Sequence, residues 1–324
     1  MPTIVVDPTH PDPQVIARAA GLIRAGELVA FPTETVYGLG ASALDVRAVA
    51  KIYAAKGRPD YNPLIVHTLG IDQARALVGE WPPLAEALAR RFWPGPLTLV
   101  LPKRPIVPDL VTAGLASVAV RAPAHPVARA LLEAAELPIA APSANRFQGI
   151  SPTVAAHVER SLGPDAALIL DGGPTQVGIE STVVGLTEGQ PILLRLGGLS
   201  AAAIEAVTGP LARPDPIARG VARASPGLDE RHYAPRGQLR VLAREQLLEA
   251  VREPRPIGAM TFEPAPRGVD HALVLPCEPR DYARLLYASL HTLDALGCKQ
   301  ILVEAVPDEP AWAAIADRLR RAAA

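Results

Sequence analysis

The hydrophobic pattern of the first part of the chain predicts amphipathic helices that alternate with short buried strands. Apolar residues recur every three or four positions between Asp12, which can cap a helix, and Gly26, which can end one. A run of apolar residues at 28–31 then predicts a buried strand. The same pattern predicts a second helix at 45–55 and a second strand at 64–67.

Further apolar runs predict six more strands, and four amphipathic stretches predict helices among them. The strands are expected at 97–101, 117–121, 138–141, 167–170, 182–186 and 192–196, and the helices near 83–93, 126–135, 153–161 and 199–207. Some successive strands are joined by helices and others by short turns. Because only antiparallel neighbours can be joined by short turns, the pattern predicts an α/β domain with a mixed sheet.

Residues 209–237 break this pattern. They hold five prolines, four glycines and five arginines without a sustained apolar period, which predicts an interdomain linker. After the linker, strands are expected near 239–243, 256–261, 271–275 and 300–305, and helices near 244–252, 280–296 and 311–321. The sequence therefore predicts a first domain at 1–208, the linker, and a small parallel-sheet domain at 238–324.

Composition supports a folded protein of two domains. Of the 324 residues, 49% are apolar and 20% charged, and about 150 residues per domain is the usual length. The longest stretch without Asp, Glu, Lys or Arg, Phe147 to Val158, has 12 residues, whereas a bilayer span needs roughly 18 to 20 apolar ones. The first residues lack the basic and apolar regions of a secretory signal. We therefore expect a cytoplasmic enzyme or binding protein that does not cross a membrane.

Charge and cysteine content narrow the class further. The net charge is −1, which argues against a broad nucleic-acid-binding face but allows a local basic pocket. Cys277 and Cys298 lie 21 positions apart, so they form neither a disulfide framework nor a paired zinc site. We expect both to be small buried residues.

The first segment with candidate chemistry, 31–44, reads FPTETVYGLGASAL. It is expected to form a turn between a strand and a helix, where small ligands often bind. Gly38, Gly40 and Ala43 match a dinucleotide fingerprint, with Asp60 further on, but the glycines come too late after the strand. Alternatively, the glycines supply turn conformations.

A second segment, KGRPDYNPLIVH at 56–67, carries Lys56 and Arg58 just past a predicted helix end. Cations there can simply complement the helix dipole. Lysine is rare in this chain, however, two prolines stiffen the connection, and Asn62 and His67 flank the next strand. Cations on a stiff loop at a sheet edge suit phosphate or carboxylate binding.

A third segment, PIAAPSANRFQGISPT, presents Ser143 and Asn145 before a predicted helix start. Ser151 or Thr153 is expected to cap that helix, and the same helix start, preceded by Ser and Asn donors, is also a ready anion site. Two further segments end strands in arginine, SVAVR at 117–121 and the segment before RLGG at 195–198. Such arginines recognise carboxylate or phosphate groups, or form structural salt bridges.

The motifs that are missing also guide the interpretation. The sequence has no G-x-S-x-G elbow, no P-loop and no H-E-x-x-H, and His67, His125 and His157 are not spaced as metal ligands. Hydroxyls, amides and cations recur instead. Such groups bind and polarise anionic substrates without becoming covalently attached to them.

Taken in order, PTETVYGLG, KGRPDYNPLIVH, SVAVRAP, APSAN with ISPT, and GIESTVV before LLRLG resemble the YrdC family. The K-x-R and S-x-N pairs, Lys56 with Arg58 and Ser143 with Asn145, are among that family's signatures. With RHYAP in the linker and a further domain, the chain resembles the two-domain L-threonylcarbamoyladenylate synthases. That resemblance implies an open, twisted α/β sheet around a basic cavity and a smaller Rossmann-like second domain.

The resemblance also implies a reaction. L-threonine, bicarbonate or CO2, and ATP would give threonylcarbamoyl-AMP and pyrophosphate, for the threonylcarbamoyladenosine modification of tRNA. Mg²⁺ would arrive with ATP, and the product would pass to a tRNA threonylcarbamoyl transferase. Stable nucleic-acid binding and membrane binding are not expected.

Site residues follow from the matched motifs. Around L-threonine the resemblance places Thr35, His67, Arg121, Ser181 and the main chain near Ala141. At ATP it places Arg58, Asn62, Ser117, Ser143, Asn145, Ser151, Arg195 and, in the linker as a lid, Tyr233. Lys56 and Arg58 would stabilise the charge that develops on the phosphates.

Two alternatives remain at this point. The basic cavity could grip RNA phosphates, which would require an extended basic surface and a steep salt dependence. A nicotinamide-dependent oxidoreductase rests only on the weak glycine match.

Overall fold

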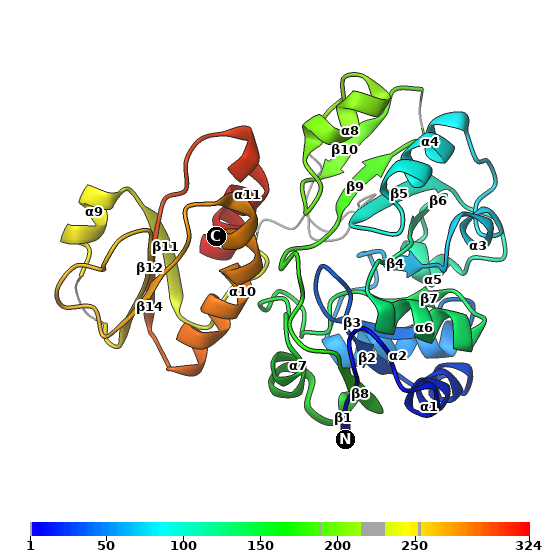
Figure 1. Cartoon of the computed structure of the whole chain (residues 1–324), viewed down its shortest axis with the longest axis horizontal. Coiled ribbons are helices and arrows are strands. Elements are labelled where there is room, and N and C mark those ends of the chain that lie inside the picture. Colours follow the sequence, from blue (N-terminus) through cyan, green and yellow to red (C-terminus); the bar gives the residue numbers. More distant parts are fainter. Residues whose placement is uncertain (1, 188, 215–230, 252–253) are drawn as a thin grey trace.

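A computed structural model of the chain describes residues 2–187, 189–214, 231–251 and 254–324. Two α/β domains lie side by side, with the N-terminus in the larger domain and the C-terminus in the smaller one (Figure 1). A ten-stranded sheet forms the centre of the larger domain, and a four-stranded sheet forms that of the smaller one. The predicted fold class, a mixed α/β sheet followed by a second α/β domain, is confirmed.

The larger sheet has the order β1-β8-β2-β3-β7-β4-β6-β5-β9-β10. Its strands are β1 (Thr3–Val5), β2 (Val29–Phe31), β3 (Gly38–Ser42), β4 (Ile65–His67), β5 (Leu97–Pro102), β6 (Ser117–Arg121), β7 (Ile139–Ala140), β8 (Leu168–Asp171), β9 (Thr182–Gly185) and β10 (Ile192–Arg195). β4 and β6 run parallel, whereas β6 and β5 run antiparallel. The sheet is therefore mixed, as the connections predict.

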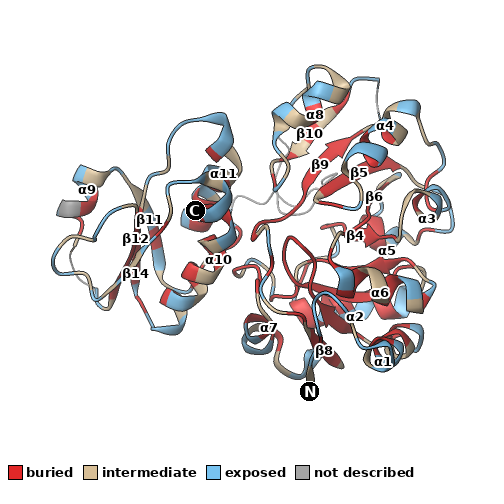
Figure 2. Ribbon diagram, in the orientation of Figure 1, coloured by how far each residue is buried: buried red, intermediate tan, exposed pale blue. Residues whose placement is uncertain are grey.

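Helices cover both faces of this sheet. They are α1 (Pro13–Arg24), α2 (Val46–Lys56), α3 (Ile71–Arg75), α4 (Pro83–Phe92), α5 (Asp109–Thr112), α6 (Pro126–Ala135), α7 (Ala155–Leu162) and α8 (Ala201–Thr208). In β2, Val29 and Phe31 pack with α1 and α6, while Ala30 between them packs with α2. Since side chains alternate along a strand, both faces of the sheet are buried, and Figure 2 shows the strands as the most buried part of the domain.

The segment around Gly38 and Gly40 corrects one prediction. It forms strand β3, antiparallel to β2, and is not a turn that leads into a helix. A Cβ on Gly40 would lie 2.6 Å from Cε1 of Phe31, so glycine is needed here for close packing and not for a special backbone angle. The dinucleotide interpretation loses its premise, because the glycines do not stand at a helix start.

Other differences concern short or local features. The sequence pattern did not predict β1, α3 or α5, which have only three to five residues each. Cys298 is buried as expected, but the expectation was wrong for Cys277, which is exposed.

The smaller domain has a fully parallel sheet in the order β11-β14-β12-β13. Its elements are β11 (Gln238–Leu242), α9 (Arg244–Glu249), β12 (Ile257–Thr261), β13 (His271–Val274), α10 (Pro279–Ala295), β14 (Gln300–Glu304) and α11 (Ala313–Ala323). Helices α10 and α11 lie on the side of the sheet that faces the larger domain (Figure 1). These two helices therefore form the contact between the domains.

The interface between the domains is closely packed. Ile150 and Ile179 of the larger domain belong to one apolar cluster with residues of α10 and α11. A Cβ on Gly178 would lie 2.4 Å from Cα of Arg284, so the loop before β9 approaches the backbone of α10. His157 of α7 stacks on His291 of α10 with ring centroids 3.7 Å apart.

Both described ends of the linker contact the larger domain. Ala212 forms a bridge with Ile192, and Ala234 forms one with Gly149. Residues 215–230, which make up much of the expected lid, lie outside the described residues. Within the described ranges, no helix combines the length and the apolar character needed to cross a bilayer.

Gly178→Ala tests the closeness of the interface. Gly173 and Gly178 have almost the same φ, +80° and +81°, but a Cβ on Gly173 would meet nothing within 4 Å. Both substitutions share the left-handed strain, so the difference between them reports the clash with α10. We expect Gly178→Ala to lower the free energy of unfolding by about 1 to 3 kcal/mol more than Gly173→Ala in urea titrations. Equal losses would contradict this packing.

Candidate active site

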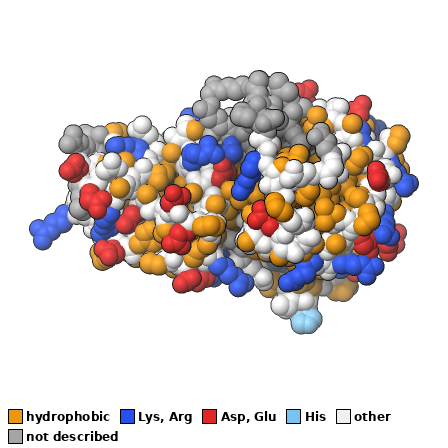
Figure 3. Space-filling view, turned by 90° about the horizontal axis from the view of Figure 1, so that it is seen from above, with side chains coloured by type: hydrophobic (Ala, Val, Ile, Leu, Met, Phe, Trp, Pro, Cys, Tyr) orange, Lys and Arg blue, Asp and Glu red, His pale blue; other side chains and the backbone are white. Residues whose placement is uncertain are grey.

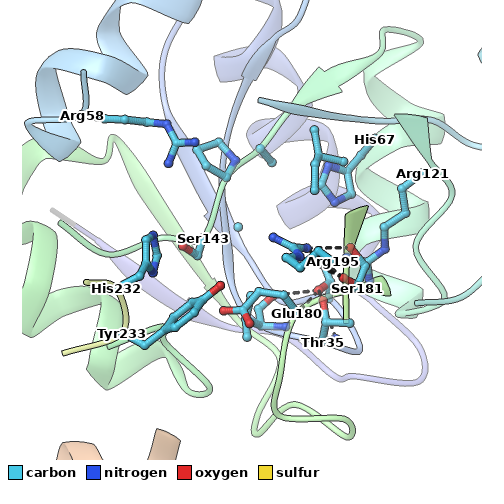
Figure 4. A pocket seen from close by; sticks show the side chains of 16 residues that line it. Thr35, Arg58, His67, Arg121, Ser143, Glu180, Ser181, Arg195, His232 and Tyr233 are labelled. Atoms are coloured by element: carbon cyan, nitrogen blue, oxygen red, sulfur yellow. Dashed lines mark hydrogen bonds between the residues drawn. The ribbon is translucent and has the colours of Figure 1, made fainter. Parts of the chain in front are cut away.

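A small cavity lies where several strands of the larger sheet end and the linker meets it (Figure 4). Its volume is about 50 Å³. The lining residues come from the loop after β2, from β3, β4 and β6, from the loops after α2 and β7, from the segment around β9 and β10, and from the linker. They are Thr33, Thr35, Val36, Gly38, Arg58, Ile65, His67, Arg121, Ala141, Pro142, Ser143, Glu180, Ser181, Arg195, His232 and Tyr233.

Arg121 and His67 reach the cavity because their strands are parallel neighbours. The register pairs His67 at the end of β4 with Arg121 at the end of β6. Arg121 is buried, and its Nη2 donates to Oε1 of Glu34 at 2.6 Å while its Nε donates to the carbonyl of Gly95 at 3.2 Å. The salt bridge left open by the sequence is therefore present, and the same arginine also lines the cavity.

Arg195 holds a second wall of the cavity. Its Nε and Nη2 donate to the carbonyl of Ser181 at 3.2 and 2.9 Å, and Nη2 also donates to the Ser181 hydroxyl at 3.1 Å. That hydroxyl shares a hydrogen bond of 2.8 Å with Thr98. Burial, more than any neighbouring charge, lowers the pKa of Arg195. An anion beside this guanidinium would offset the cost of burying it.

Arg58 lines the opposite end of the cavity (Figure 4). Its Nη2 donates to Oδ1 of Asn62 at 2.6 Å and to the carbonyl of Pro63 at 2.9 Å. The two prolines noted in the sequence belong to this loop, which turns back toward the guanidinium. Asn62 thus orients Arg58 and does not itself line the cavity.

Lys56 lies behind the cavity wall. Its Nζ donates to the carbonyl of Ser143 at 2.5 Å and to the carbonyl of Asn145. Burial lowers the pKa of Lys56 well below its usual value, and the charge of Arg58 lowers it further. The K-x-R pair therefore divides, with Arg58 at the cavity and Lys56 fixing the turn that carries Ser143.

Several buried polar atoms at this site have no partner within the described residues. They are Nδ1 of His67, Oδ1 of Asn145, Nδ1 of His232 and the hydroxyl of Tyr233. Burial holds the pKa of His67 at about 3, with a smaller contribution from Arg121, so its imidazole is neutral near pH 7. Buried polar groups are rarely left unpaired, and three of these four line the cavity, which indicates that a polar ligand completes the site.

The buried charges around the site are unbalanced. Among the described residues, four arginines are buried, Arg58, Arg121, Arg195 and Arg318, in addition to Lys56 with its lowered pKa, whereas the buried carboxylates are only Glu34 and Glu180. Taking charges out of water is costly unless an opposite charge or several hydrogen bonds compensate for it. The surplus of positive charge therefore favours an anionic ligand.

Nine of the predicted site residues line the cavity: Thr35, Arg58, His67, Arg121, Ala141, Ser143, Ser181, Arg195 and Tyr233. The other five, Lys56, Asn62, Ser117, Asn145 and Ser151, do not. Ser117 begins β6, about 13 Å along the strand from Arg121. Ser151 was expected to cap α7 if Thr153 did not, and neither does, because α7 follows Val154 without a side-chain cap.

Sequence reasoning missed two ionisable residues at the cavity. Glu180 accepts a hydrogen bond of 2.6 Å from the Ser151 hydroxyl, and His232 precedes Tyr233 in the linker. Glu180 lies in the motif GIEST and His232 in RHYAP, and both motifs were used for the resemblance. Neither residue was predicted to contact a ligand. A glutamate in an anion site is expected to repel its ligand, so its role depends on partners that a linear sequence does not show.

The described residues provide no metal centre of their own. No group of three or more His, Cys, Asp or Glu side chains among them is placed to hold an ion. Both buried carboxylates near the cavity are already engaged, Glu34 by Arg121 and Glu180 by Arg318. These side chains therefore do not fit a resident Mg²⁺ site.

Comparison with known proteins places this site in a family. A family model described as "Telomere recombination", which covers Sua5, YciO and YrdC proteins, matches residues 21–197. The chain belongs to the Sua5/YciO/YrdC family. A second model, described as the C-terminal domain of threonylcarbamoyl-AMP synthase, matches residues 199–324. The resemblance stated from the motifs is therefore confirmed, including that of the second domain.

Relatives of known name within the Sua5/YciO/YrdC family match nearly the whole chain. Threonylcarbamoyl-AMP synthase of Pyrococcus abyssi is 45% identical, over 94% of this chain and 92% of its own. The enzyme of that name from Bacillus subtilis is 44% identical, over 96% and 93%. The crystal structure of P. abyssi Sua5 complexed with L-threonine superposes with a TM-score of 0.94 at 42% identity, covering 100% of this chain and 98% of that one.

The pKa of His67 predicts a pH effect. An unfolded histidine titrates near 6.5 but folded His67 only at about 3, so between these values the unfolded state binds more protons and stability falls as the pH falls. His67→Gln removes this dependence. In urea titrations from pH 7 to pH 5, we expect its stability to fall less steeply than that of the wild type, by up to about 1.4 kcal/mol per pH unit. Parallel profiles would contradict a neutral buried His67.

Proposed function

We propose that this chain is a threonylcarbamoyl-AMP synthase, which makes threonylcarbamoyl-AMP and pyrophosphate from L-threonine, bicarbonate or CO2, and ATP. Relatives of that name match almost its full length. The observation that carries the proposal is the cavity itself, which gathers Arg58, Arg121 and Arg195 with hydroxyl groups and neutral imidazoles. Such a set suits two anions, a carboxylate and a polyphosphate, in adjacent positions.

The end of the cavity around Arg121 fits the amino acid. Arg121 has five N–H donors, and its described hydrogen bonds to Glu34 and Gly95 use only two of its nitrogens. The remaining donors can hold the threonine carboxylate. Thr35, His67, Ser181 and the main chain at Ala141 line the same end and offer partners for the threonine hydroxyl and amine.

The end around Arg58 fits the nucleotide. Arg58, Ser143, Arg195 and Tyr233 line the cavity there or beside it. Lys56 and Asn62 act from behind the lining residues, through hydrogen bonds with the carbonyl of Ser143 and with Arg58. Asn145 bonds to the carbonyl of Gly149 in the next turn, and Ser151 bonds to Glu180. Ser117 lies at the far end of β6 and does not line the cavity, so its proposed contact with the nucleotide rests on the matched motif.

The chemistry needs no protein nucleophile. The deprotonated threonine amine adds to CO2 and gives a carbamate with release of one proton. A carbamate oxygen then attacks the α-phosphorus of ATP as pyrophosphate leaves. Arg58 would stabilise the charge on the phosphoryl oxygens, and the shared cavity supplies proximity. Because AMP is transferred, the activity is that of a nucleotidyltransferase. Mg²⁺ would enter with ATP, and we assign it no side chain.

Access to the cavity requires movement. Its volume of about 50 Å³ is far below the roughly 300 Å³ that small-molecule sites usually offer. His232 and Tyr233 of the linker line it, so their displacement would admit the substrates and their return would exclude water from a reactive mixed anhydride. We therefore propose that the linker acts as a lid over the cavity, and the residues that support this proposal are His232 and Tyr233.

The destination of the product follows from its chemistry. A reactive threonylcarbamoyl adenylate needs a transferase that accepts it, and we propose a tRNA threonylcarbamoyl transferase in the cytoplasm. The RNA-binding alternative gains no support from the described part of the face in Figure 3, where basic, acidic and apolar side chains are intermingled. An extended basic surface would be needed for that function.

Pyrophosphate release tests the proposed function. With ATP and bicarbonate, we expect release only when L-threonine is present, and release without that dependence would refute the proposal. Arg58→Ala should lower the rate by about 10²-fold or more, because a charge-stabilising donor is lost. Arg47→Ala, which removes an arginine that is 93% exposed on α2, is the matched control and should leave the rate unchanged.

A further inference from the structure

The smaller domain reaches the active site through two buried side chains. Arg318 of α11 has a fully buried side chain, and its Nε donates to Oε2 of Glu180 at 2.8 Å. Tyr287 of α10 donates its hydroxyl to both oxygens of Glu180, at 3.0 and 3.2 Å. Glu180 itself lines the cavity (Figure 4).

We propose that Arg318, assisted by Tyr287, is a positioning residue that sets the geometry of Ser181 and Arg195 from the second domain. This inference rests on the proposed synthase function. Neither residue lines the cavity, so both would act through the groups that they hold.

Two of the three acceptors of Arg318 flank the pair that it positions, and the third is Asp317 on the same helix, which accepts from Nη1 at 3.1 Å. Its Nε contacts Glu180, which precedes Ser181, and its Nη2 donates at 2.8 Å to the carbonyl of Leu196, which follows Arg195. Ser181 and Arg195 in turn bond to each other. One rigid guanidinium therefore fixes both chain segments that meet at this wall of the cavity.

The same side chains also locate the linker. Cζ of Arg318 lies 5.1 Å from the centroid of the Tyr233 ring, and that ring stacks on Tyr287 with centroids 5.6 Å apart. A cation over an aromatic face and two stacked rings are both favourable contacts. Arg318 thus touches the described end of the lid and the wall that the lid meets.

The energetics favour a positioning role over a purely stabilising one. A buried ion pair often contributes little net stability, because desolvation offsets the attraction between the charges. Without Arg318, however, the Glu180 carboxylate beside the cavity would lose its ion-pair partner, and Arg195 alone would offset its charge. The carboxylate would then repel carboxylate and phosphate groups more strongly. The pair therefore allows a glutamate to shape an anion site.

The test compares three full-length variants by steady-state pyrophosphate release at varied threonine and ATP. Arg318→Met should lower kcat/KM for threonine by roughly ten- to a hundredfold, because a small misplacement of binding groups is costly. Arg320→Met is the matched control, since Arg320 lies on the same helix, also bonds to Asp317, and is 65% exposed. Tyr287→Phe keeps the ring and should give a smaller loss in the same direction.

Two further readouts separate positioning from folding. In Arg318→Met, activity should become dependent on pH in the mildly acidic range. Burial raises the pKa of Glu180, but Arg318, Arg195 and the hydrogen bonds outweigh burial and hold this pKa at about 2 in the wild type, so loss of Arg318 should raise it. Removing the unpaired charge with Glu180→Gln in the Arg318→Met background should restore thermal stability and abolish this pH dependence. It should leave kcat/KM below the wild-type value, because Ser181 and Arg195 are still not held by Arg318. If Arg318→Met does not fold, this double variant and Tyr287→Phe carry the test.

The outcomes are distinguishable. If the wild type releases no threonine-dependent pyrophosphate, the proposed function fails, whatever the variants do. If the wild type is active and folded Arg318→Met matches Arg320→Met in kcat/KM, the positioning role is wrong. Wild-type kinetics in folded Tyr287→Phe together with full activity of the double variant would overturn it as well.

Discussion

The burial of cationic side chains around one cavity is the constraint on which the rest of the structure depends. Each of these groups would be costly in a low-dielectric interior, and the fold supplies acceptors for it. Lys56 is held by main-chain carbonyls, Arg121 by Glu34, and Arg318 by Glu180. The loops that provide these acceptors are fixed in place by the charges that they neutralise.

The incomplete compensation explains how a chain of net charge −1 can serve anionic substrates. Acidic and basic residues balance over the whole chain, but the described buried cations outnumber the buried carboxylates. The positive field is therefore confined to the interior of one site. A broad basic surface would attract nucleic acid, whereas a small enclosed one selects ligands that can enter it.

Periodicity and caps were enough to predict most elements of the fold. Helix α1 begins after Asp12 because the carboxylate accepts from the amide of Gln14, as its position in the sequence suggests. Strand β3 could not be predicted, since GLGAS lacks the β-branched and aromatic residues of typical strands and its glycines are required by Phe31. That requirement belongs to tertiary packing and leaves no local signal.

The site shows the same division between local and distant information. Arg58 and Ser143 stand in compact motifs, so their place at the cavity could be predicted. The separation of Lys56 from Arg58 could not, because Lys56 is the last residue of α2 and Arg58 follows Gly57, whose left-handed conformation turns the chain between them. Arg318 lies 138 positions from Glu180. Its spacing from Ile315 and Ala322 places it on the buried face of α11, but no motif around it indicates which residue it contacts.

Glu180 connects the two domains physically. Ser151 holds its carboxylate from the larger domain, and Tyr287 and Arg318 hold it from the smaller one. Separating the domains would leave this carboxylate with only one described partner and would expose the apolar cluster that surrounds it. The interface and the active site therefore share one polar network. A change in the packing of α10 or α11 must shift Ser181, because Tyr287 and Arg318 hold the Glu180 carboxylate and Ser181 is the next residue in the chain.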